Sequence, residues 1–314
     1  AVLTARRELA ATTVGNYALF AGGYNGSNLT TVDAYNTSLV RLTPEALATG
    51  RKLFAGTSTG NYALFGGGNI GSALSTVDAY DSSLVHTTPQ SLSVARYYLA
   101  AATVGNYAVF AGGQAAHVDP RATVDVYDTS LIRSTPQVLS VARYQLAGTS
   151  CGDYAIFAGG RTDNISVNST VDAYDTSLIR YTPQTLSVAR SLLAGASTPK
   201  YAIFAGGTDS YSAFNTVDAY NTSLIRSTPE TLSTARSALA GATVGEYAIF
   251  AGGTGYSSVV DAYTSFITTV YVPITVGSKY KLNSDTEITA TTNKVISVSN
   301  PINGYIKYKG GTFE

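Results

Sequence analysis

The chain alternates short apolar runs with polar breaks, a pattern that predicts β-strands rather than helices. Between residues 98 and 135 the apolar runs are YLAAATV, NYAVFAGG, ATVDVYD and SLIRST. Each has the length of a strand, and none shows the spacing of a helical apolar face. The break GN between the first two runs and the break DTS between the last two are short and polar, as hairpin turns require. This stretch therefore predicts one antiparallel sheet of four strands.

The same pattern occurs six times, with a period of 45 to 47 residues. A Tyr opens the second run of each copy, an Asp lies in the third run, and an Arg precedes the first run. The Tyr residues are Tyr17, Tyr62, Tyr107, Tyr154, Tyr201 and Tyr247, and the Asp residues are Asp33, Asp78, Asp125, Asp172, Asp218 and Asp261. The Arg residues are Arg6, Arg51, Arg96, Arg143, Arg190 and Arg236. Six such sheets, none able to bury both faces alone, predict an all-β, six-bladed β-propeller over residues 1–272.

The second run of each copy carries the strongest motif. AIFAGG, ALFAGG, AVFAGG and ALFGGG, each followed by a downstream Tyr, resemble kelch repeats. The chain has no Trp, and the place that Trp usually takes on the fourth strand of a kelch repeat holds Leu178 and Ile179 in the fourth copy. No WD or GH pair occurs, which disfavours WD40 repeats of similar period. We interpret the Gly pairs as structural, because inner strands crowd near the axis and no helix follows to bind a phosphate.

The composition is that of a folded protein without a strong net charge. Of the 314 residues, 45% are hydrophobic, and Lys plus Arg equals Asp plus Glu at 20 each. A nucleic acid or an anionic membrane would meet no net positive field. The single cysteine, Cys151, excludes an intrachain disulfide and a CxxC metal site. With no apolar run of spanning length, we expect no nucleic-acid partner, no membrane insertion, no metal and no cofactor.

Residues 273–314 differ in composition from the repeats. All 13 Arg lie at or before Arg236, whereas five of the seven Lys lie between Lys279 and Lys309. Alternating Thr, Ile, Val and Tyr predict two or three strands, which we interpret as a cap, a ring-closing segment or a docking segment for a larger assembly. The start, AVLTARRELA, has neither an initiator Met nor a signal core, and it matches the end of an LSVAR connection. Processing and a further upstream blade are both left open.

The segments after the Gly pairs vary while the frame around them is nearly constant. They read YNGSNLT, NIGSALS, QAAHVDPRA, RTDNISVNS, TDSYSAFN and TGYSS, and we call them windows. Antiparallel topology places all six on one face of the propeller, and loops on a rigid scaffold often carry binding residues. Large rigid side chains suit recognition. The candidate ligand-binding residues of the windows are Tyr24, His117, Arg121, Arg161, Tyr211 and Tyr256.

The Arg and Asp series, one of each per copy, have two interpretations. Structural pairing of Arg with Asp is the simpler one. The resemblance to kelch proteins implies a second, because in animal kelch adaptors the arginine at this place can face the ligand groove. Arg6, Arg51, Arg96, Arg143, Arg190 and Arg236 would then form a basic ring around the pocket mouth. The two roles are compatible, since an Arg has enough donors for a carboxylate and a ligand.

Enzyme interpretations have less support. A copper oxidase like galactose oxidase needs a Cys beside Tyr, a stacking Trp and His ligands. Here Cys151 lies in a turn, Trp is absent, and His86 and His117 belong to different elements. No GxSxG motif supports a hydrolase. We therefore expect no enzyme activity, although sugar isomerisation remains an alternative, because sialate mutarotase is also a six-bladed kelch protein.

The prediction for function is a surface binding module that recognises a glycan or a cell-surface protein through one propeller face. Ser, Thr, Asn, Gly and Tyr dominate the exposed loops and suit hydrogen bonding and stacking. The chain looks similar to kelch-repeat proteins of bacteria and their phages, which implies a receptor-binding or adhesin role at an extracellular or virion surface. A structural spacer within a larger particle is the remaining alternative.

Overall fold

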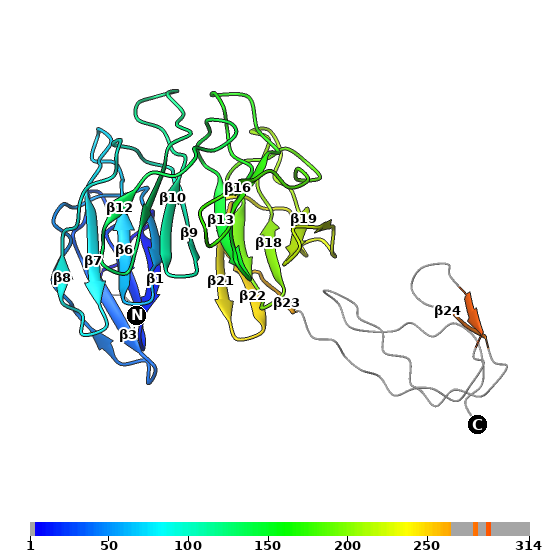
Figure 1. Ribbon diagram of the computed structural model, residues 1–314, viewed down its shortest axis with the longest axis horizontal. Coiled ribbons are helices and arrows are strands. Elements are labelled where there is room, and N and C mark those ends of the chain that lie inside the picture. Colours follow the sequence, from blue (N-terminus) through cyan, green and yellow to red (C-terminus); the bar gives the residue numbers. More distant parts are fainter. Residues whose placement is uncertain (1–3, 265–278, 282–286, 290–314) are drawn as a thin grey trace.

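The computed structural model describes residues 4–264, 279–281 and 287–289, and the protein in this part is all β. Strands β1–β23 form six antiparallel sheets, blades 1 to 6, which follow one another in chain order around an axis (Figure 1). Blades 1 to 5 have four strands each, and blade 6 has three among the described residues. The predicted six-bladed β-propeller is confirmed. The predicted fourth strand of blade 6 and most of residues 273–314 lie outside the described residues.

The four strand positions recur from blade to blade. The first strands are β1 (Ala10–Val14), β5 (Ala55–Ser58), β9 (Ala100–Val104), β13 (Ala147–Cys151), β17 (Ala194–Ser197) and β21 (Ala240–Val244). The second strands are β2 (Tyr17–Ala21), β6 (Tyr62–Gly66), β10 (Tyr107–Ala111), β14 (Tyr154–Ala158), β18 (Tyr201–Ala205) and β22 (Tyr247–Ala251). The third strands are β3 (Val32–Asn36), β7 (Val77–Asp81), β11 (Val124–Tyr127), β15 (Val171–Tyr174), β19 (Val217–Asn221) and β23 (Val260–Thr264). The fourth strands are β4 (Arg41–Leu42), β8 (His86–Thr87), β12 (Arg133–Ser134), β16 (Arg180–Tyr181) and β20 (Arg226–Ser227). A separate antiparallel pair joins β24 (Lys279–Lys281) to β25 (Glu287–Thr289).

The fourth strands are shorter than the SLIRST pattern predicts, and the turn before them explains why. In blade 3, Asp128 Oδ1 accepts backbone N–H groups of Ser130 at 2.8 Å and Ile132 at 2.9 Å. Leu131 between them has a φ of 61°, in the left-handed region. An Asp side chain that caps the turn in this way competes with the sheet ladder, so β12 pairs with β11 only from Arg133 onward.

Adjacent blades share one apolar core at each interface. Between blades 3 and 4, Val104 and Val109 of blade 3 pack with Phe157 and Tyr174 of blade 4, all at most 1% exposed. The rings of Phe157 and Tyr174 meet edge to face at 6.1 Å between centroids, a favourable arrangement for aromatic pairs. We call the face of a blade that packs on the next blade its downstream face, and the opposite face its upstream face.

The Gly pairs fit closely between consecutive blades. Gly159 has a φ of 67°, and a Cβ there would lie 2.6 Å from the carbonyl oxygen of Arg190 in the next blade. Gly160 has a φ of 107° and donates its N–H to the same oxygen at 2.9 Å. A side chain at Gly159 would separate the two blades, and the left-handed backbone favours glycine at both positions. The structural interpretation of the Gly pairs is confirmed.

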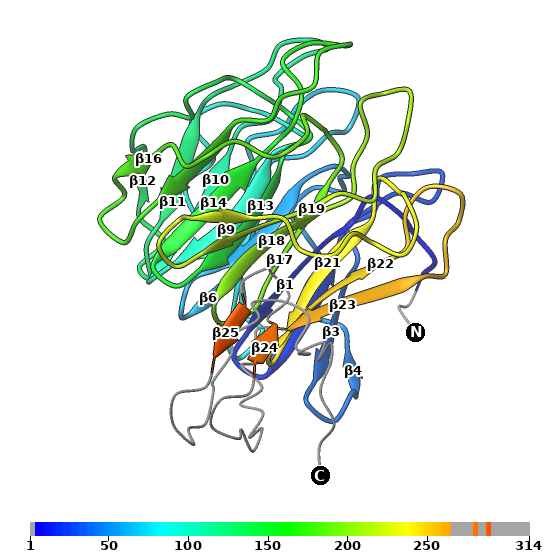
Figure 2. The same ribbon diagram turned by 90° about the vertical axis from the view of Figure 1, so that its right-hand side faces the viewer.

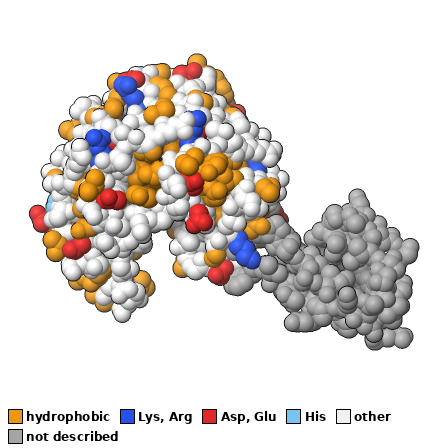
Figure 3. Space-filling view, viewed as in Figure 1, with side chains coloured by type: hydrophobic (Ala, Val, Ile, Leu, Met, Phe, Trp, Pro, Cys, Tyr) orange, Lys and Arg blue, Asp and Glu red, His pale blue; other side chains and the backbone are white. Residues whose placement is uncertain are grey.

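In the described part of the chain, the ring is open between blades 6 and 1. Five cores join the six blades, and among the described residues no sixth core joins blade 6 to blade 1. Figure 3 shows a wide notch between the parts that Figure 1 labels β1 and β21, with hydrophobic side chains gathered above it. Figure 2 shows the three strands of blade 6 side by side at this edge.

Cys151 is a core residue of the interface between blades 4 and 5, where it is 2% exposed. Burial raises the pKa of its thiol to about 11. Because the thiolate is the reactive form, we expect Cys151 in the folded protein to resist alkylation by iodoacetamide at pH 8. In urea the same residue should react fully, which mass spectrometry can follow. Rapid labelling without denaturant would contradict this packing.

Candidate functional site

The residues that surround the axis on the window face come from two positions in each blade. The first is the pair of residues directly after the repeated Arg, and the second is the first residue of the window. In blade 3, Tyr97 donates its N–H to the carbonyl of Gln114 at 3.0 Å and accepts the N–H of Gln114 at 2.8 Å. The same bridge joins Arg7 to Tyr24, Lys52 to Asn69, Tyr144 to Arg161, and Ser191 to Thr208. The frame thus holds variable side chains at fixed positions.

The second residue after each Arg has a left-handed backbone. These residues, with φ between 52° and 59°, are Glu8, Leu53, Tyr98, Gln145, Leu192 and Ala238. Left-handed φ costs a non-glycine residue about 1–2 kcal/mol, and hydrogen bonds from blade to blade offset this cost. Five of the six residues donate their backbone N–H to the carbonyl oxygen of the left-handed residue in the preceding blade. These bonds, at 2.8–3.2 Å, run from Leu53 to Glu8, Tyr98 to Leu53, Gln145 to Tyr98, Leu192 to Gln145 and Ala238 to Leu192. We call this hydrogen-bonded chain around the axis the backbone collar.

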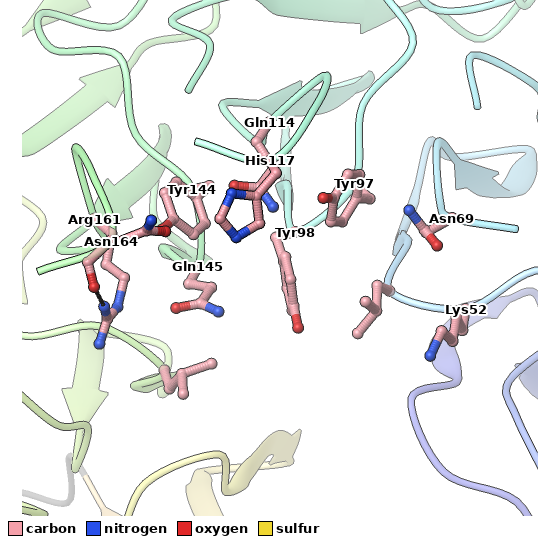
Figure 4. A pocket seen from close by; sticks show the side chains of 12 residues that line it. Lys52, Asn69, Tyr97, Tyr98, Gln114, His117, Tyr144, Gln145, Arg161 and Asn164 are labelled. Carbon is pink, nitrogen blue, oxygen red and sulfur yellow. Dashed lines mark hydrogen bonds between the residues drawn. The ribbon is translucent and has the colours of Figure 1, made fainter. Parts of the chain in front are cut away.

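A pocket of about 470 Å³ lies over blades 2 to 5 of the collar (Figure 4). Its lining consists of Lys52, Leu53, Asn69, Tyr97, Tyr98, Gln114, His117, Tyr144, Gln145, Arg161, Asn164 and Leu192. Pockets for small ligands typically have volumes of about 300–1,000 Å³. The pocket therefore has the size for a small ligand, at the centre of the face that the sequence predicted for binding.

Three tyrosine rings form the aromatic part of this pocket. The ring centroids of Tyr97 and Tyr98 are 5.3 Å apart, and those of Tyr98 and Tyr144 are 6.3 Å apart. Burial raises the pKa of Tyr98 and of Tyr144, so both hydroxyls are neutral at physiological pH. The Tyr144 hydroxyl donates to the carbonyl of Asp163 at 2.9 Å, which fixes its ring.

Amide side chains form the polar part of the pocket. Gln114 is only 5% exposed, and its Oε1 has no hydrogen-bond partner in the described structure. Oε1 of Gln145 is also buried without a partner. Figure 4 shows the side chains of Gln114, Gln145, Tyr98 and His117 around one open space. A buried acceptor without a partner costs free energy, and a ligand that donates hydrogen bonds would remove that cost once the amide side chains turn toward the open space.

The charged side chains at the rim are positive. Arg161 donates from Nε to Ser191 Oγ at 3.1 Å and from Nη1 to the carbonyl of Asn164 at 2.5 Å. Lys52 lies on the opposite side of the pocket in Figure 4. No Asp or Glu occurs among the residues that line the pocket. The described residues also contain no group of three or more His, Cys, Asp or Glu that could hold a metal ion.

The repeated arginines lie beneath this surface and not at the pocket mouth. Each pairs with the Asp of its own blade: Arg6 with Asp33, Arg51 with Asp78, Arg96 with Asp125, Arg143 with Asp172, Arg190 with Asp218 and Arg236 with Asp261, at 2.5–2.8 Å. These Arg side chains are at most 1% exposed. The structural pairing of Arg with Asp is confirmed, and the expectation of a basic ring at the pocket mouth is corrected. Arg6 borders a second hollow of about 440 Å³. Its side chain is completely buried, so only its main chain can face this hollow.

Each buried guanidinium joins the connection before the first strand to the second and third strands of its blade. Arg143 pairs with Asp172 on β15 at 2.8 Å and donates from Nη2 to the carbonyl of Phe157 on β14 at 3.2 Å. Desolvation lowers the pKa of Arg143, and the charge and hydrogen bond of Asp172 act in the opposite direction. Asp172 Oδ1 also accepts the N–H of Ser140 in the preceding connection at 3.0 Å. These groups are therefore part of the scaffold that holds the collar.

The six window candidates lie in four different settings. His117 and Arg161 line the central pocket. Tyr24 contacts Lys52, whose Nζ is 4.4 Å from the ring centroid, and borders the second hollow. Arg121 pairs with Asp119 within its own window. Tyr211 and Tyr256, 86% and 103% exposed, do not line the central pocket.

Sequence reasoning missed the residues directly after each Arg. Tyr97, Tyr98, Tyr144 and Gln145 belong to this set and form much of the pocket. A signal was present, because the two residues after Arg read RE, KL, YY, YQ, SL and SA in the six copies. They vary as much as the windows do, although the Arg before them and the strand after them are nearly constant.

No protein-family model matches the sequence, and a comparison with curated proteins also finds no match. Among solved structures, that of YjhT is similar, with a TM-score of 0.66 over 91% of this chain and 97% of that chain. The two sequences are 11% identical over the matched region. No helix in the described part of this chain is long and apolar enough to cross a membrane. The likeness to YjhT extends over most of this chain and shows a shared β-propeller fold.

Proposed function

We propose that this protein is a carbohydrate-binding module whose central pocket holds a sugar unit of a surface glycan. The observation that supports this most directly is the combination of the Tyr97, Tyr98 and Tyr144 rings with the unpartnered amide oxygens of Gln114 and Gln145. A sugar ring offers C–H faces that stack on aromatic rings and hydroxyl groups that donate to amide oxygens. The pocket provides both kinds of contact within one space.

The charge of the pocket points to acidic sugars as the preferred ligands. Lys52 and Arg161 stand at its rim, and no carboxylate lines it. A sugar carboxylate would meet attraction from both cations, although Glu8, whose Oε2 lies 3.2 Å from Lys52 Nζ, offsets part of the attraction of Lys52. We therefore expect tighter binding of carboxylated sugars than of their neutral counterparts, with a preference that weakens as salt is added.

A glycan array with full-length protein tests the proposal, followed by titration calorimetry with the best ligand. Specific retention of a family of glycans with a common sugar unit supports the binding module. Proton NMR of the free sugar in the same samples measures anomer exchange, and acceleration by the protein would favour the sugar-isomerase alternative. Retention of no glycan would contradict the module and favour a spacer role.

The resemblance to kelch repeats and the exposed loops extend the proposal to a receptor-binding or adhesin protein at the surface of a bacterium or virion. In that role the outer windows contact parts of a long glycan, or of a glycosylated protein, that the central pocket does not reach. The rings of Tyr211 and Tyr256 are almost completely exposed and are the strongest candidates for such contacts.

Replacing both Tyr211 and Tyr256 with Ala is expected to weaken a long ligand. Stacking contributes about 0.5–1.5 kcal/mol per ring beyond area burial, so affinity for an oligosaccharide should fall measurably in calorimetry. Affinity for the corresponding monosaccharide should be unchanged, because neither ring lines the pocket. An equal loss for both ligands would mean that the sugar lies on the outer windows.

A further inference from the structure

The second hollow lies in blade 1, on the same face of the propeller as the central pocket. It measures about 440 Å³ and is lined by Arg6, Arg7, Tyr24, Asn25 and Gly26. The central pocket measures about 470 Å³, so the two spaces are similar in size, and both fall within the range of pockets for small ligands. The second hollow therefore has room for one further sugar unit.

Lys52 connects the two hollows. It lines the central pocket, and its Nζ lies 4.4 Å from the ring centroid of Tyr24, which lines the second hollow. Backbone bridges from Lys52 to Asn69 and from Arg7 to Tyr24 hold these residues in the frame. A ligand that reaches Lys52 from the central pocket is therefore next to the second hollow.

The cations around Tyr24 outnumber the carboxylate that pairs with them. The guanidinium carbon of Arg7 lies 5.6 Å from the centroid of the same ring that Lys52 contacts. Glu8 pairs with both cations, at 3.6 Å from Arg7 Nε and 3.2 Å from Lys52 Nζ. Two cations and one carboxylate leave one positive charge in excess. Because like charges held this close repel each other, a second anion would stabilise the cluster.

Arg7 is the member of this cluster that a ligand can reach most easily. Its side chain is 73% exposed, whereas the side chains of Lys52 and Glu8 are 26% and 30% exposed. A guanidinium can bind a carboxylate through two parallel hydrogen bonds, a geometry that an ammonium group cannot offer. The exposed guanidinium beside the Tyr24 ring thus suits a sugar that carries a carboxylate.

We propose that the second hollow is a subsite for a second carboxylated sugar, and that the preferred ligand is an acidic oligosaccharide with one unit in each hollow. This inference rests on the proposed function, because it places the first unit in the central pocket. Arg7 binds the carboxylate of the second unit beside Tyr24. Lys52, between the hollows, attracts the carboxylates of both units, and Glu8 offsets part of this attraction.

Titration calorimetry at low salt tests the subsite with four probes, the monomers and dimers of galacturonic acid and of α2,8-linked N-acetylneuraminic acid. For at least one of these sugars the dimer should bind about tenfold or more tightly than the monomer, a gain that one charge-assisted hydrogen bond can provide. Equal affinity of monomer and dimer would overturn the second subsite and leave the central pocket as the sugar site. If none of the four probes bound, the subsite would also be overturned, and the glycan array would show whether the proposed function fails with it.

Two variants with opposite expected effects separate the charge of the subsite from damage to the fold. Arg7→Gln should reduce the advantage of the dimer to below about threefold and leave the affinity for the monomer unchanged, because Arg7 does not line the central pocket. Glu8→Gln copies Gln145, which has the same left-handed backbone in blade 4, and should strengthen binding of the dimer by removing the opposing carboxylate. A full dimer advantage in Arg7→Gln, or no gain in Glu8→Gln, would overturn the proposal.

Lys200→Gln is the matched control for the loss of one positive charge. Lys200 is exposed in the turn between β17 and β18, on the face opposite the windows. Its replacement should change neither the monomer affinity nor the dimer affinity. An equal loss of dimer affinity in Lys200→Gln and Arg7→Gln would mean that the net charge of the protein, and not the second hollow, attracts the second unit.

Discussion

Asp172→Ala is expected to lower the free energy of unfolding by about 3–5 kcal/mol, the usual cost of leaving one partner of a buried ion pair unpaired. The variant would leave the Arg143 guanidinium in a site without exposed surface, 2.8 Å from where the carboxylate was. It would also remove the acceptor for the Ser140 N–H, so the connection from blade 3 would lose its anchor. Urea unfolding followed by circular dichroism measures the change.

Asp175→Asn is the matched control for this prediction. Asp175 caps the exposed turn after β15 by accepting N–H groups of Ser177 and Ile179, both at 2.9 Å. Asn36 and Asn221 fill the same capping role in blades 1 and 5, so Asn at 175 should cost little beyond the exposed hydrogen bond that Asp175 Oδ2 accepts from the Tyr181 hydroxyl at 3.0 Å. A loss below about 1 kcal/mol for Asp172→Ala would mean that the pair contributes little to the scaffold. If Arg143→Ala abolished ligand binding without lowering stability, the arginine would belong to the ligand site after all.

The architecture could be predicted from the sequence because the same strand and turn residues recur in each copy. The Tyr that opens the second strand and the Gly pair after it recur at one period in all six copies, and a turn capped by Asp or Asn recurs in blades 1 to 5, so a correct interpretation of one copy extends to the others. The predicted length of the fourth strand was too great for a local reason. Leu131 belongs to the apolar run SLIRST, yet its left-handed φ of 61° places it in the turn.

The role of the repeated arginines could not be decided from sequence. An Arg that follows the same spacing can donate to a carboxylate within its blade or to a ligand at the axis, and both satisfy its donors. Burial decides between them. The collar residues Tyr98 and Gln145 occupy the surface above, and the guanidinium of Arg143 is enclosed below with Asp172.

For a related reason, the sequence predicted only some of the residues that line the pocket. The windows were identified because they differ in length and composition, and His117 and Arg161 do line the pocket. In the sequence, Tyr97 and Tyr98 resemble the start of an apolar strand. The neighbouring residues give no sign that Tyr98 has a left-handed backbone, which brings both rings to the axis. The sequence also could not show whether blade 6 contacts blade 1. Closure of the ring depends on the angle between blades and not on any single repeat.

Converting Tyr97 and Tyr98 of blade 3 into the equivalent residues of blade 6 is expected to weaken glycan binding by about 1–3 kcal/mol, or about 5- to 150-fold in Kd. The change is Tyr97→Ser with Tyr98→Ala, and it copies Ser237 and Ala238. Ala238 has a φ of 52°, close to the 55° of Tyr98, so the backbone can remain as it is. Calorimetry with the ligand from the array measures the loss.

The control for this variant lies on the opposite face. Asp128→Asn together with Asp175→Asn changes two exposed turns to the residue that blades 1 and 5 already use there, so affinity should not change. The melting temperature of each variant shows that the fold is intact. If the blade 3 variant melted like the original protein and still bound the sugar with unchanged affinity, the tyrosines at the axis would not form the sugar site. The outer windows that carry Tyr211 and Tyr256 would then be the place to look, since they present the most exposed rings on the same face.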